Sequence, residues 1–215
     1  MIRRVLQWLF PAKCILCKRV LEKNETDLCR ACRTDQPEYP YGRKKVPHIA
    51  DLTALWRYEG QVRKSLHRYK FGSARHYAAP YARLLAMRIS RDLPRADVVT
   101  WVPVSAKRLR QRGYDQAELL SRAAAPELEL PCEQLLEKIR DNRANSGLTE
   151  PAHRRANVLG VYRAVRQEDI RGKRVLLLDD IVTTGATASE CARVLLTAGA
   201  EIVYFAAMAA ATSSK

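Results

Sequence analysis

The chain has 215 residues, which suits one substantial domain and a small additional module. Hydrophobic residues account for 47% of the sequence, so a buried core can form, but no apolar run approaches the roughly 20 residues that span a bilayer. The 38 basic and 23 acidic side chains give a net charge of +15. This charge favours an anionic partner, such as a phosphorylated metabolite, nucleic acid or an anionic membrane surface.

The first ten residues begin like a signal peptide, with basic residues inside a short apolar stretch. The apolar part is too short for a signal peptide, however, and residues 11–14 offer no small-residue cleavage site. We therefore expect a cytoplasmic protein. The same ten residues can form a short amphipathic helix that packs on its own domain or, alternatively, lies on the inner face of the membrane.

Two Cys-x-x-Cys pairs lie near the N-terminus: Cys14 and Cys17, then Cys29 and Cys32. Their spacing is typical of four thiolates that bind one tetrahedral zinc ion. Because cysteine fills all four positions, the metal has no open coordination site and is expected to be structural. Two disulfides or a redox-active pair are the alternatives, and a cytoplasmic location disfavours disulfides. We predict an N-terminal zinc-binding module over residues 1–36.

After a proline-rich linker at residues 34–50, strands and helices alternate along the chain. Apolar residues that alternate or run together predict strands at 51–58, 98–104, 157–165, 175–178 and 201–208, with a further strand starting at 128–130. Apolar residues with helical spacing predict helices at 60–72, 78–91, 115–125 and 186–197. The alternation predicts an α/β domain with a largely parallel sheet flanked by helices, over residues 50–212.

Four basic residues follow the strand predicted at 98–104: Lys107, Arg108, Arg110 and Arg112. Open α/β sheets bind ligands beyond the carboxyl ends of their strands, and we expect a loop at this place. Guanidinium groups pair bidentately with phosphate oxygens, so the loop suits a pyrophosphate. A solvated basic loop or a nucleic-acid contact is the alternative. The polar residues 138–157 predict a second loop over the same site.

The most informative stretch is the apolar strand at 175–178, which ends in two carboxylates, Asp179 and Asp180. The residues that lead from them into the next helix are Ile181, Val182, Thr183, Thr184, Gly185, Ala186 and Thr187. Gly185 lets the backbone approach a phosphate closely, and the amide groups at a helix start point toward an anion. The carboxylates must then face sugar hydroxyls or a divalent cation, unless they form only a solvated acidic turn.

This stretch resembles the phosphoribosyl-pyrophosphate (PRPP) motif of type I phosphoribosyltransferases, in which an acidic pair and two apolar residues precede Thr-Thr-Gly. The whole chain resembles the ComF family of late-competence proteins, which join a four-cysteine zinc module to a Rossmann-like type I phosphoribosyltransferase domain. The other matching segments are Lys70-Phe-Gly72, Val102-Pro-Val104, residues 107–120, Gly147-Leu148 and residues 154–157. All of them occur in family order over nearly the full length of the chain.

The resemblance implies transfer of a phosphoribosyl group from PRPP, with Mg²⁺ and release of pyrophosphate, in a protein linked to DNA uptake. It implies that Asp179 and Asp180 hold the ribose hydroxyls and act as the catalytic residues. The 5-phosphate is assigned to the loop at 183–187 within a PRPP site at 179–187, and the departing pyrophosphate to the basic loop. The sequence does not identify the acceptor.

The alternative function is a non-catalytic module that senses PRPP or phosphate and binds single-stranded DNA, with other competence proteins as further partners. Basic residues at 63–70 and 154–174 can follow a DNA strand. Tyr58, Tyr69 and Phe71 can stack on its bases, although their spacing is more typical of core residues.

The sequence departs from the family pattern at three positions. Asp115 stands where Asn is usual, and Asn142 and Asn145 replace Thr and Gln. A carboxylate at position 115 is expected to repel a phosphate unless it meets a metal ion or an arginine. We still expect PRPP binding despite these departures, and we expect them to affect the part of the site that binds the acceptor.

Overall fold

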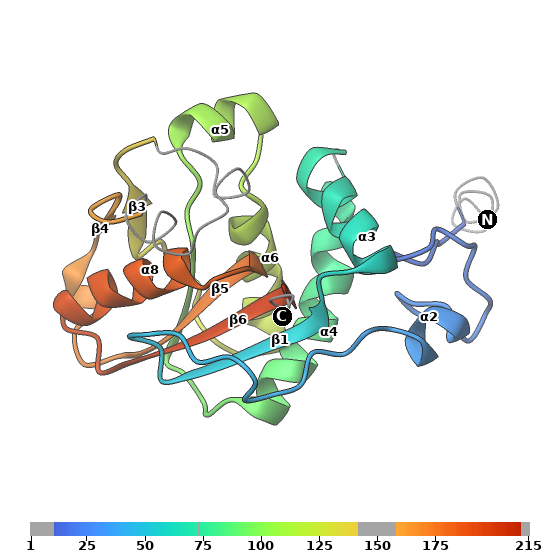
Figure 1. Cartoon of the computed structure of the whole chain (residues 1–215), viewed down its shortest axis with the longest axis horizontal. Helices are drawn as coiled ribbons and strands as arrows, with labels where there is room; N and C mark the ends of the chain where they lie inside the picture. The colour runs from blue at the N-terminus through green and yellow to red at the C-terminus, as the bar shows by residue number, and fades with distance from the viewer. Residues whose placement is uncertain (1–10, 73, 142–157, 212–215) are drawn as a thin grey trace.

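The computed structural model describes residues 11–72, 74–141 and 158–211 (Figure 1). Several features expected from the sequence lie outside these residues. They are the amphipathic helix at 1–10, nearly all of the loop at 138–157, the family matches at 147–148 and 154–157, and Asn142 and Asn145.

The described chain alternates helices with strands, as expected. Its helices are α2 (Arg30–Thr34), α3 (Gly60–Phe71), α4 (Ala78–Asp92), α5 (Ala106–Arg112), α6 (Gln116–Glu127) and α8 (Ala186–Thr197). Its strands are β1 (Asp51–Arg57), β2 (Val98–Trp101), β3 (Leu136–Lys138), β4 (Tyr162–Ala164), β5 (Arg174–Val182) and β6 (Ile202–Ala210). Short 3₁₀ turns occur at Arg75–Tyr77 and Gln167–Asp169.

Four strands form one parallel sheet in the order β1-β6-β5-β2, and β3 and β4 form a separate antiparallel pair. The central strands β5 and β6 are buried along almost their whole length. Apolar residues make up nearly all of β6 and the 175–178 part of β5, because helices cover both faces of a parallel sheet. Strand β5 does not end at Leu178 as predicted; it continues through Asp179 and Asp180 to Val182. In the register, Leu178 of β5 lies beside Trp101 of β2 and Ala206 of β6.

Helices α4 and α6 pack on one face of the sheet and α8 packs on the other, so the domain has three layers (Figure 1). Helix α4 buries Tyr81, Leu85 and Ile89, which recur every four residues and form one stripe. The core on this side also takes in residues of the N-terminal module, including Ile15 and Leu28. The α8 side has its own core, centred on Leu177, Leu195 and Phe205.

The structure corrects three of the predicted strands. The strand predicted at 98–104 ends at Trp101, because Pro103 has no N–H to continue the hydrogen-bond ladder after Val102 bonds Leu178 at 3.0 Å. No strand begins at 128–130: the Leu128 amide still bonds to the carbonyl groups of α6, and Glu129 has a left-handed φ of 54°. The strand predicted at 157–165 is present only as the short strand β4.

A fourth correction bears on the site, since the basic stretch is a helix rather than a loop. Ser105 is the N-cap of α5 and accepts a hydrogen bond from the Arg108 amide at 3.4 Å. Gly113 ends the helix in the left-handed conformation, with a φ of 74°. A serine cap and a terminal glycine are ordinary helix signals, and both were present in the sequence.

The segment predicted as a linker, residues 34–50, is packed against the domain. Tyr39 is buried and its amide bonds to the Leu55 carbonyl at 3.3 Å, while the Arg57 amide bonds to the Pro37 carbonyl at 2.7 Å. The segment therefore extends along β1 before the chain enters the sheet.

Candidate functional site

A pocket of about 580 Å³ lies beyond the carboxyl ends of β2 and β5, the place where open α/β sheets bind ligands. Its wall is assembled from segments that are far apart in the sequence. The groups that line it include the end of α3, the residues after β2, one side of α5, the start of α6, Lys138 and Tyr162 of the β3–β4 pair, and the stretch from β5 into α8.

Every residue of the predicted PRPP site, from Asp179 to Thr187, lines this pocket. The four predicted cations divide into two pairs. Arg108 and Arg112 line the pocket, and Arg112 is half-buried; Lys107 and Arg110 are exposed on another side of α5. The division follows from the helix, since residues four apart share a face and residues two apart do not.

The loop before α8 owes its shape to Gly185. This glycine has a φ of 85°, in the left-handed region, and is the N-cap of α8. A Cβ at this position would lie 2.5 Å from Cγ2 of Val46, so only glycine fits. The amide groups at the start of α8 are thereby directed toward the pocket side of the helix N-terminus, which suits an anion.

Residues 44–48 support this loop from outside the pocket. Lys44 donates a hydrogen bond from Nζ to the Thr183 carbonyl, and burial lowers the pKa of this lysine. Farther along, His48 Nδ1 lies 3.2 Å from the Ser189 hydroxyl on α8. The segment predicted as a linker is therefore a structural part of the phosphate loop's surroundings.

The acidic pair lines the pocket from within β5. Asp180 is buried, and its Oδ2 lies 2.9 Å from Nζ of Lys70 at the end of α3. Asp179 accepts a hydrogen bond from the Asp180 amide at 2.7 Å. Burial raises the pKa of Asp179 well above its ordinary value, and the neighbouring Asp180 charge adds to the rise. Two adjacent carboxylates are thus held in a partly desolvated site with one ammonium beside them.

Two lysines of the pocket were not assigned to the site from the sequence. Burial lowers the pKa of Lys70, but the charge of Asp180 and their hydrogen bond outweigh it, so the pKa is raised overall. Lys138 also lines the pocket, with Nζ 5.4 Å from the centre of the Tyr162 ring. Partial burial, and then the charge of Arg108, lower the pKa of Lys138 to about 8. Lys138 lies in no recognised motif, and the family match at Lys70-Phe-Gly72 did not assign Lys70 to the site.

The three aromatic residues near α3 have different surroundings. Tyr69 is fully buried, as its spacing predicts, whereas Phe71 is 59% exposed and Tyr58 is half-buried; the latter two line the pocket. The His67 ring lies 4.8 Å from Phe71, and the Arg112 guanidinium lies 4.9 Å from the centre of the same phenyl ring. One end of the pocket therefore has an accessible aromatic surface.

Asp115 also lines the pocket, yet backbone amides satisfy its carboxylate. It is the N-cap of α6 and accepts hydrogen bonds from Val104 N at 2.8 Å, Ala117 N at 2.9 Å and Glu118 N at 3.2 Å. Burial nevertheless raises its pKa. The expected repulsion of a phosphate assumed that the charge of Asp115 is uncompensated. Three backbone amides compensate this charge, in place of a metal ion or an arginine.

The four cysteines of the N-terminal module converge on one point. Their sulfur atoms all lie within 4.8 Å of one another, and Cys17 Sγ and Cys29 Sγ are 3.6 Å apart. Sulfur atoms around a tetrahedral zinc ion, each at about 2.3 Å, are separated by similar distances. Cys14 and Cys29 are buried, and Cys29 also caps α2. The residues present therefore fit a structural zinc ion.

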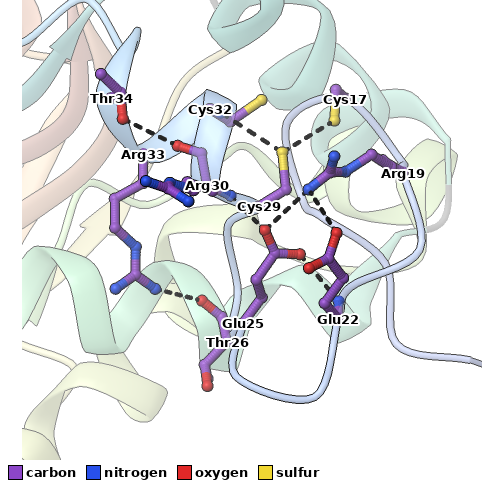
Figure 2. A network of polar contacts seen from close by, with 10 residues as sticks. All are labelled: Cys17, Arg19, Glu22, Glu25, Thr26, Cys29, Arg30, Cys32, Arg33 and Thr34. Carbon is purple, nitrogen blue, oxygen red and sulfur yellow. Dashed lines mark hydrogen bonds and ion pairs between the residues drawn. The ribbon is translucent and has the colours of Figure 1, made fainter.

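The loop between the two cysteine pairs is held by Glu25 (Figure 2). Its carboxylate accepts hydrogen bonds from the Arg19 guanidinium at 2.9 Å, the Glu22 amide at 2.9 Å and the Arg30 amide at 2.5 Å. One acidic side chain thus joins the first cysteine pair to the start of α2, which carries the last cysteine.

Within the described residues, no helix is long and apolar enough to cross a bilayer.

Comparison with known proteins gives two family matches. Residues 115–215 match the model of the phosphoribosyl transferase domain, and residues 5–41 match that of the double zinc ribbon domain. Together with the parallel sheet and the cysteine cluster, these matches confirm the predicted type I phosphoribosyltransferase fold with an N-terminal zinc module.

Curated relatives are similar over nearly the whole chain. The DNA utilization protein YhgH of Salmonella typhi is 29% identical over 200 residues, which cover 88% of this chain and 86% of that protein. Competence protein F of Haemophilus influenzae is 26% identical over 217 residues, which cover 89% of this chain and 94% of that protein.

Among solved structures, glutamine phosphoribosylpyrophosphate amidotransferase from B. subtilis matches with a TM-score of 0.47 and 24% identity. The match covers 66% of this chain but only 30% of the amidotransferase chain.

Proposed function

The chain belongs to the ComF family, and on this premise we propose that its pocket binds PRPP with Mg²⁺ and transfers the phosphoribosyl group with release of pyrophosphate. The names of the relatives, competence protein F and DNA utilization protein, support a role for this chain in DNA uptake or use.

One observation carries the proposal: a single pocket brings together an acidic pair, a helix N-terminal loop and two arginines. Each group suits one part of PRPP. The loop at 183–187 offers amide and hydroxyl donors to the 5-phosphate. Asp179 and Asp180 can accept hydrogen bonds from the ribose hydroxyls. The guanidinium groups of Arg108 and Arg112 can pair with the pyrophosphate oxygens.

The pocket also fits Mg²⁺, which takes oxygen ligands and usually binds one or two carboxylates together with substrate phosphates. Asp179 and Asp180 would provide the protein's carboxylate oxygens to the ion. When bound, Mg²⁺ would neutralise part of the charge on the pyrophosphate.

In the proposed reaction the bond between ribose C1 and a pyrophosphate oxygen breaks, and its electron pair leaves with the pyrophosphate. C1 forms a new bond to the acceptor. Positive charge develops on the ribose ring during the transfer, and the adjacent carboxylates of Asp179 and Asp180 stabilise it. Arg108 and Arg112 stabilise the negative charge that develops on the leaving group.

A non-catalytic module that binds single-stranded DNA is the second candidate. The observation in its favour is Phe71, which is 59% exposed, because exposed aromatic rings next to basic side chains stack on bases. Tyr69 does not support this candidate, since it is fully buried and its hydroxyl donates to the Gln116 carbonyl at 2.8 Å.

The test is a calorimetric titration of PRPP with Mg²⁺ into the zinc-loaded wild type and an Asp179→Ala/Asp180→Ala variant. We expect micromolar binding by the wild type and its loss in the variant. A Glu201→Ala variant is the control, because Glu201 is an exposed carboxylate just before β6, at the other end of the sheet. A release assay for pyrophosphate with candidate acceptors then tests the transfer.

Failure of the folded, zinc-loaded wild type to bind PRPP would contradict the proposal. Binding of PRPP without pyrophosphate release, together with salt-sensitive binding of oligonucleotides that is lost in Phe71→Ala, would favour the DNA-binding module.

A further inference from the structure

Helix α3 contacts the zinc module directly. The two residues between Cys14 and Cys17, Ile15 and Leu16, point their backbone carbonyls at this helix. Arg68 donates from one guanidinium nitrogen to Ile15 O at 3.0 Å and to Leu16 O at 2.7 Å, and the Ser65 hydroxyl also donates to Ile15 O. We call the first cysteine pair, residues 14–17, the zinc knuckle. Its two carbonyls thus hold one face of α3.

The zinc knuckle is well placed to act as a fixed support. Ile15, Leu16 and Leu28 are almost fully buried in the core shared with α3 and α4, and Arg83 of α4 donates from Nε to Asp27 at 3.0 Å. In Figure 1, α3 lies between the N-terminal module and the sheet. The module is therefore packed against the domain that carries the pocket.

The next residues of α3 reach the pocket. Lys70 is two residues after Arg68, and its Nζ lies 2.9 Å from Oδ2 of Asp180. The helix backbone here is held from the opposite side, because the Tyr114 hydroxyl donates to the Tyr69 carbonyl and Gln116 Nε2 donates to the Lys70 carbonyl at 3.3 Å. One helix turn is thus fixed between the zinc knuckle and the start of α6.

We propose that Lys70 is a further PRPP-binding residue and that the zinc knuckle positions it through Arg68. The ligand role rests on the proposed function. Lys70 offsets the negative charge of the acidic pair before the ligand binds, and it offers an ammonium to the ligand's phosphate oxygens once Asp180 accepts from the ribose hydroxyls. Arg68 does not line the pocket; it acts by fixing the helix turn from which Lys70 projects.

The link to zinc follows from the chemistry of the module. A short segment with four thiolates obtains its folding free energy from the metal, so the positions of the Ile15 and Leu16 carbonyls depend on bound zinc. Removing zinc should release the Ile15 and Leu16 carbonyls from their fixed positions, so that Arg68 loses its hydrogen bonds and the turn that carries Lys70 loosens. Metal status and PRPP affinity are then coupled, and the coupling is reciprocal.

The first experiment is a double-variant cycle on zinc-loaded protein, with the zinc content of each variant measured. We expect Lys70→Met to weaken PRPP binding about tenfold or more, because a charge-assisted contact is lost, and Lys70→Arg to retain most of the affinity. We expect Arg68→Met to weaken binding by a smaller factor, about threefold to tenfold. In the Lys70→Met background, Arg68→Met should have no further effect.

Arg63→Met is the matched control, since Arg63 is an exposed arginine on the same helix. It removes the same charge and should leave PRPP affinity unchanged. If Arg68→Met leaves PRPP affinity unchanged, or weakens it equally in both backgrounds, the coupling through Lys70 is wrong.

The second experiment does not require PRPP. We expect removal of zinc by a chelator, and separately the Arg68→Met substitution, to speed amide hydrogen exchange in the last two turns of α3 but not in α8. Unchanged exchange in α3 would overturn the positioning role. If α3 responds but the wild type does not bind PRPP, the proposed function and the ligand role of Lys70 both fail, and the support of α3 by the zinc knuckle stands.

Discussion

The β5–α8 stretch and helix α5 both carry residues predicted for the pocket, but they contribute to it in different ways. Every residue from Asp179 to Thr187 lines the pocket, whereas α5 contributes Arg108 and Arg112 and exposes Lys107 and Arg110. In the first region the backbone itself forms the site, so consecutive residues take part. In the second region a helix presents only one face, so charge alone does not place a residue in the site.

The comparison separates two kinds of anion binding. A loop at a helix N-terminus binds through amide groups whose direction is set by one unusual backbone conformation. A basic helix binds through long side chains, each of which must come from the correct face. Substitutions should therefore act on backbone conformation in the first region and on individual charges in the second.

Gly185→Ala should have the largest effect, because it changes the backbone that shapes the first region. The left-handed conformation and the contact with Val46 together should lower the free energy of unfolding by about 1–3 kcal/mol. Displacement of the loop should weaken PRPP binding by about 10- to 100-fold, because hydrogen bonds from its amides to a charged phosphate are worth about 1.5–3 kcal/mol. Thermal unfolding and calorimetric titration measure the two effects.

Gly172→Ala is the matched control for this prediction. Gly172 also has a left-handed φ, of 67°, but a Cβ there meets nothing within 4 Å, so only the backbone strain remains. Adding Val46→Ala to Gly185→Ala should recover part of the lost stability by relieving the contact. Equal stability losses in Gly172→Ala and Gly185→Ala, with no recovery, would show that the fit against Val46 is unimportant.

The two pairs of cations on α5 offer a sharper test of the second region. Arg108→Met/Arg112→Met and Lys107→Met/Arg110→Met change the net charge equally. We expect substitution of the pocket pair, Arg108 and Arg112, to weaken PRPP binding by about tenfold or more, because charge-assisted hydrogen bonds to phosphate are lost. Substitution of the exposed pair, Lys107 and Arg110, should change PRPP affinity by less than about threefold, and this small change should vanish at high salt.

Calorimetric titrations of PRPP into both double variants compare the two losses of affinity. Since Arg112 also donates to Gln116 Oε1 at 3.0 Å, thermal unfolding must first show that the pocket variant is folded. Equal losses of affinity in the two variants would mean that α5 acts only through its total charge.

Much of the fold could be predicted from the sequence. The apolar run of β6 and the stripes of α3, α4 and α8 correspond closely to the observed elements, because burial on both faces or on one stripe leaves a clear pattern. The apolar run at 175–178 marks the first part of β5, which continues through the acidic pair to Val182. The same holds for the cysteine cluster, whose spacing is set by one metal ion. These features depend on residues that are close together in the chain.

The parts that were missed depend on contacts between distant segments. Lys70 and Lys138 reach the pocket from α3 and β3; no local motif contains Lys138, and the family match at Lys70-Phe-Gly72 did not assign Lys70 a role in the site. The support of Gly185 by Val46 joins two segments that are far apart in the sequence, and residues 34–50 have the composition of a linker. The helical form of the basic stretch was the exception, since its Ser105 cap and terminal Gly113 are local signals.

Lys138 allows a final test of the comparison, because it adds a cation to the pocket from outside both regions. Its pKa is about 8 in the folded chain, against an ordinary value of 10.5. Between these pH values the unfolded chain holds a proton at this lysine that the folded chain has released. The free energy of unfolding should therefore rise with pH in this window, and Lys138→Met should remove that rise.

PRPP affinity should change in the opposite direction. Above pH 8 the amine of Lys138 is increasingly neutral and attracts the pyrophosphate less, so wild-type affinity should fall by a few-fold more than that of Lys138→Met. Thermal unfolding and titration at pH 7, 8 and 9.5 test both trends, with the exposed Lys173→Met as control. If Lys138→Met and the wild type have parallel pH profiles, the partial burial of Lys138 has no effect on the site. If they diverge, part of the positive charge in the pocket comes from Lys138 on β3, which lies outside both the phosphate loop and the basic helix.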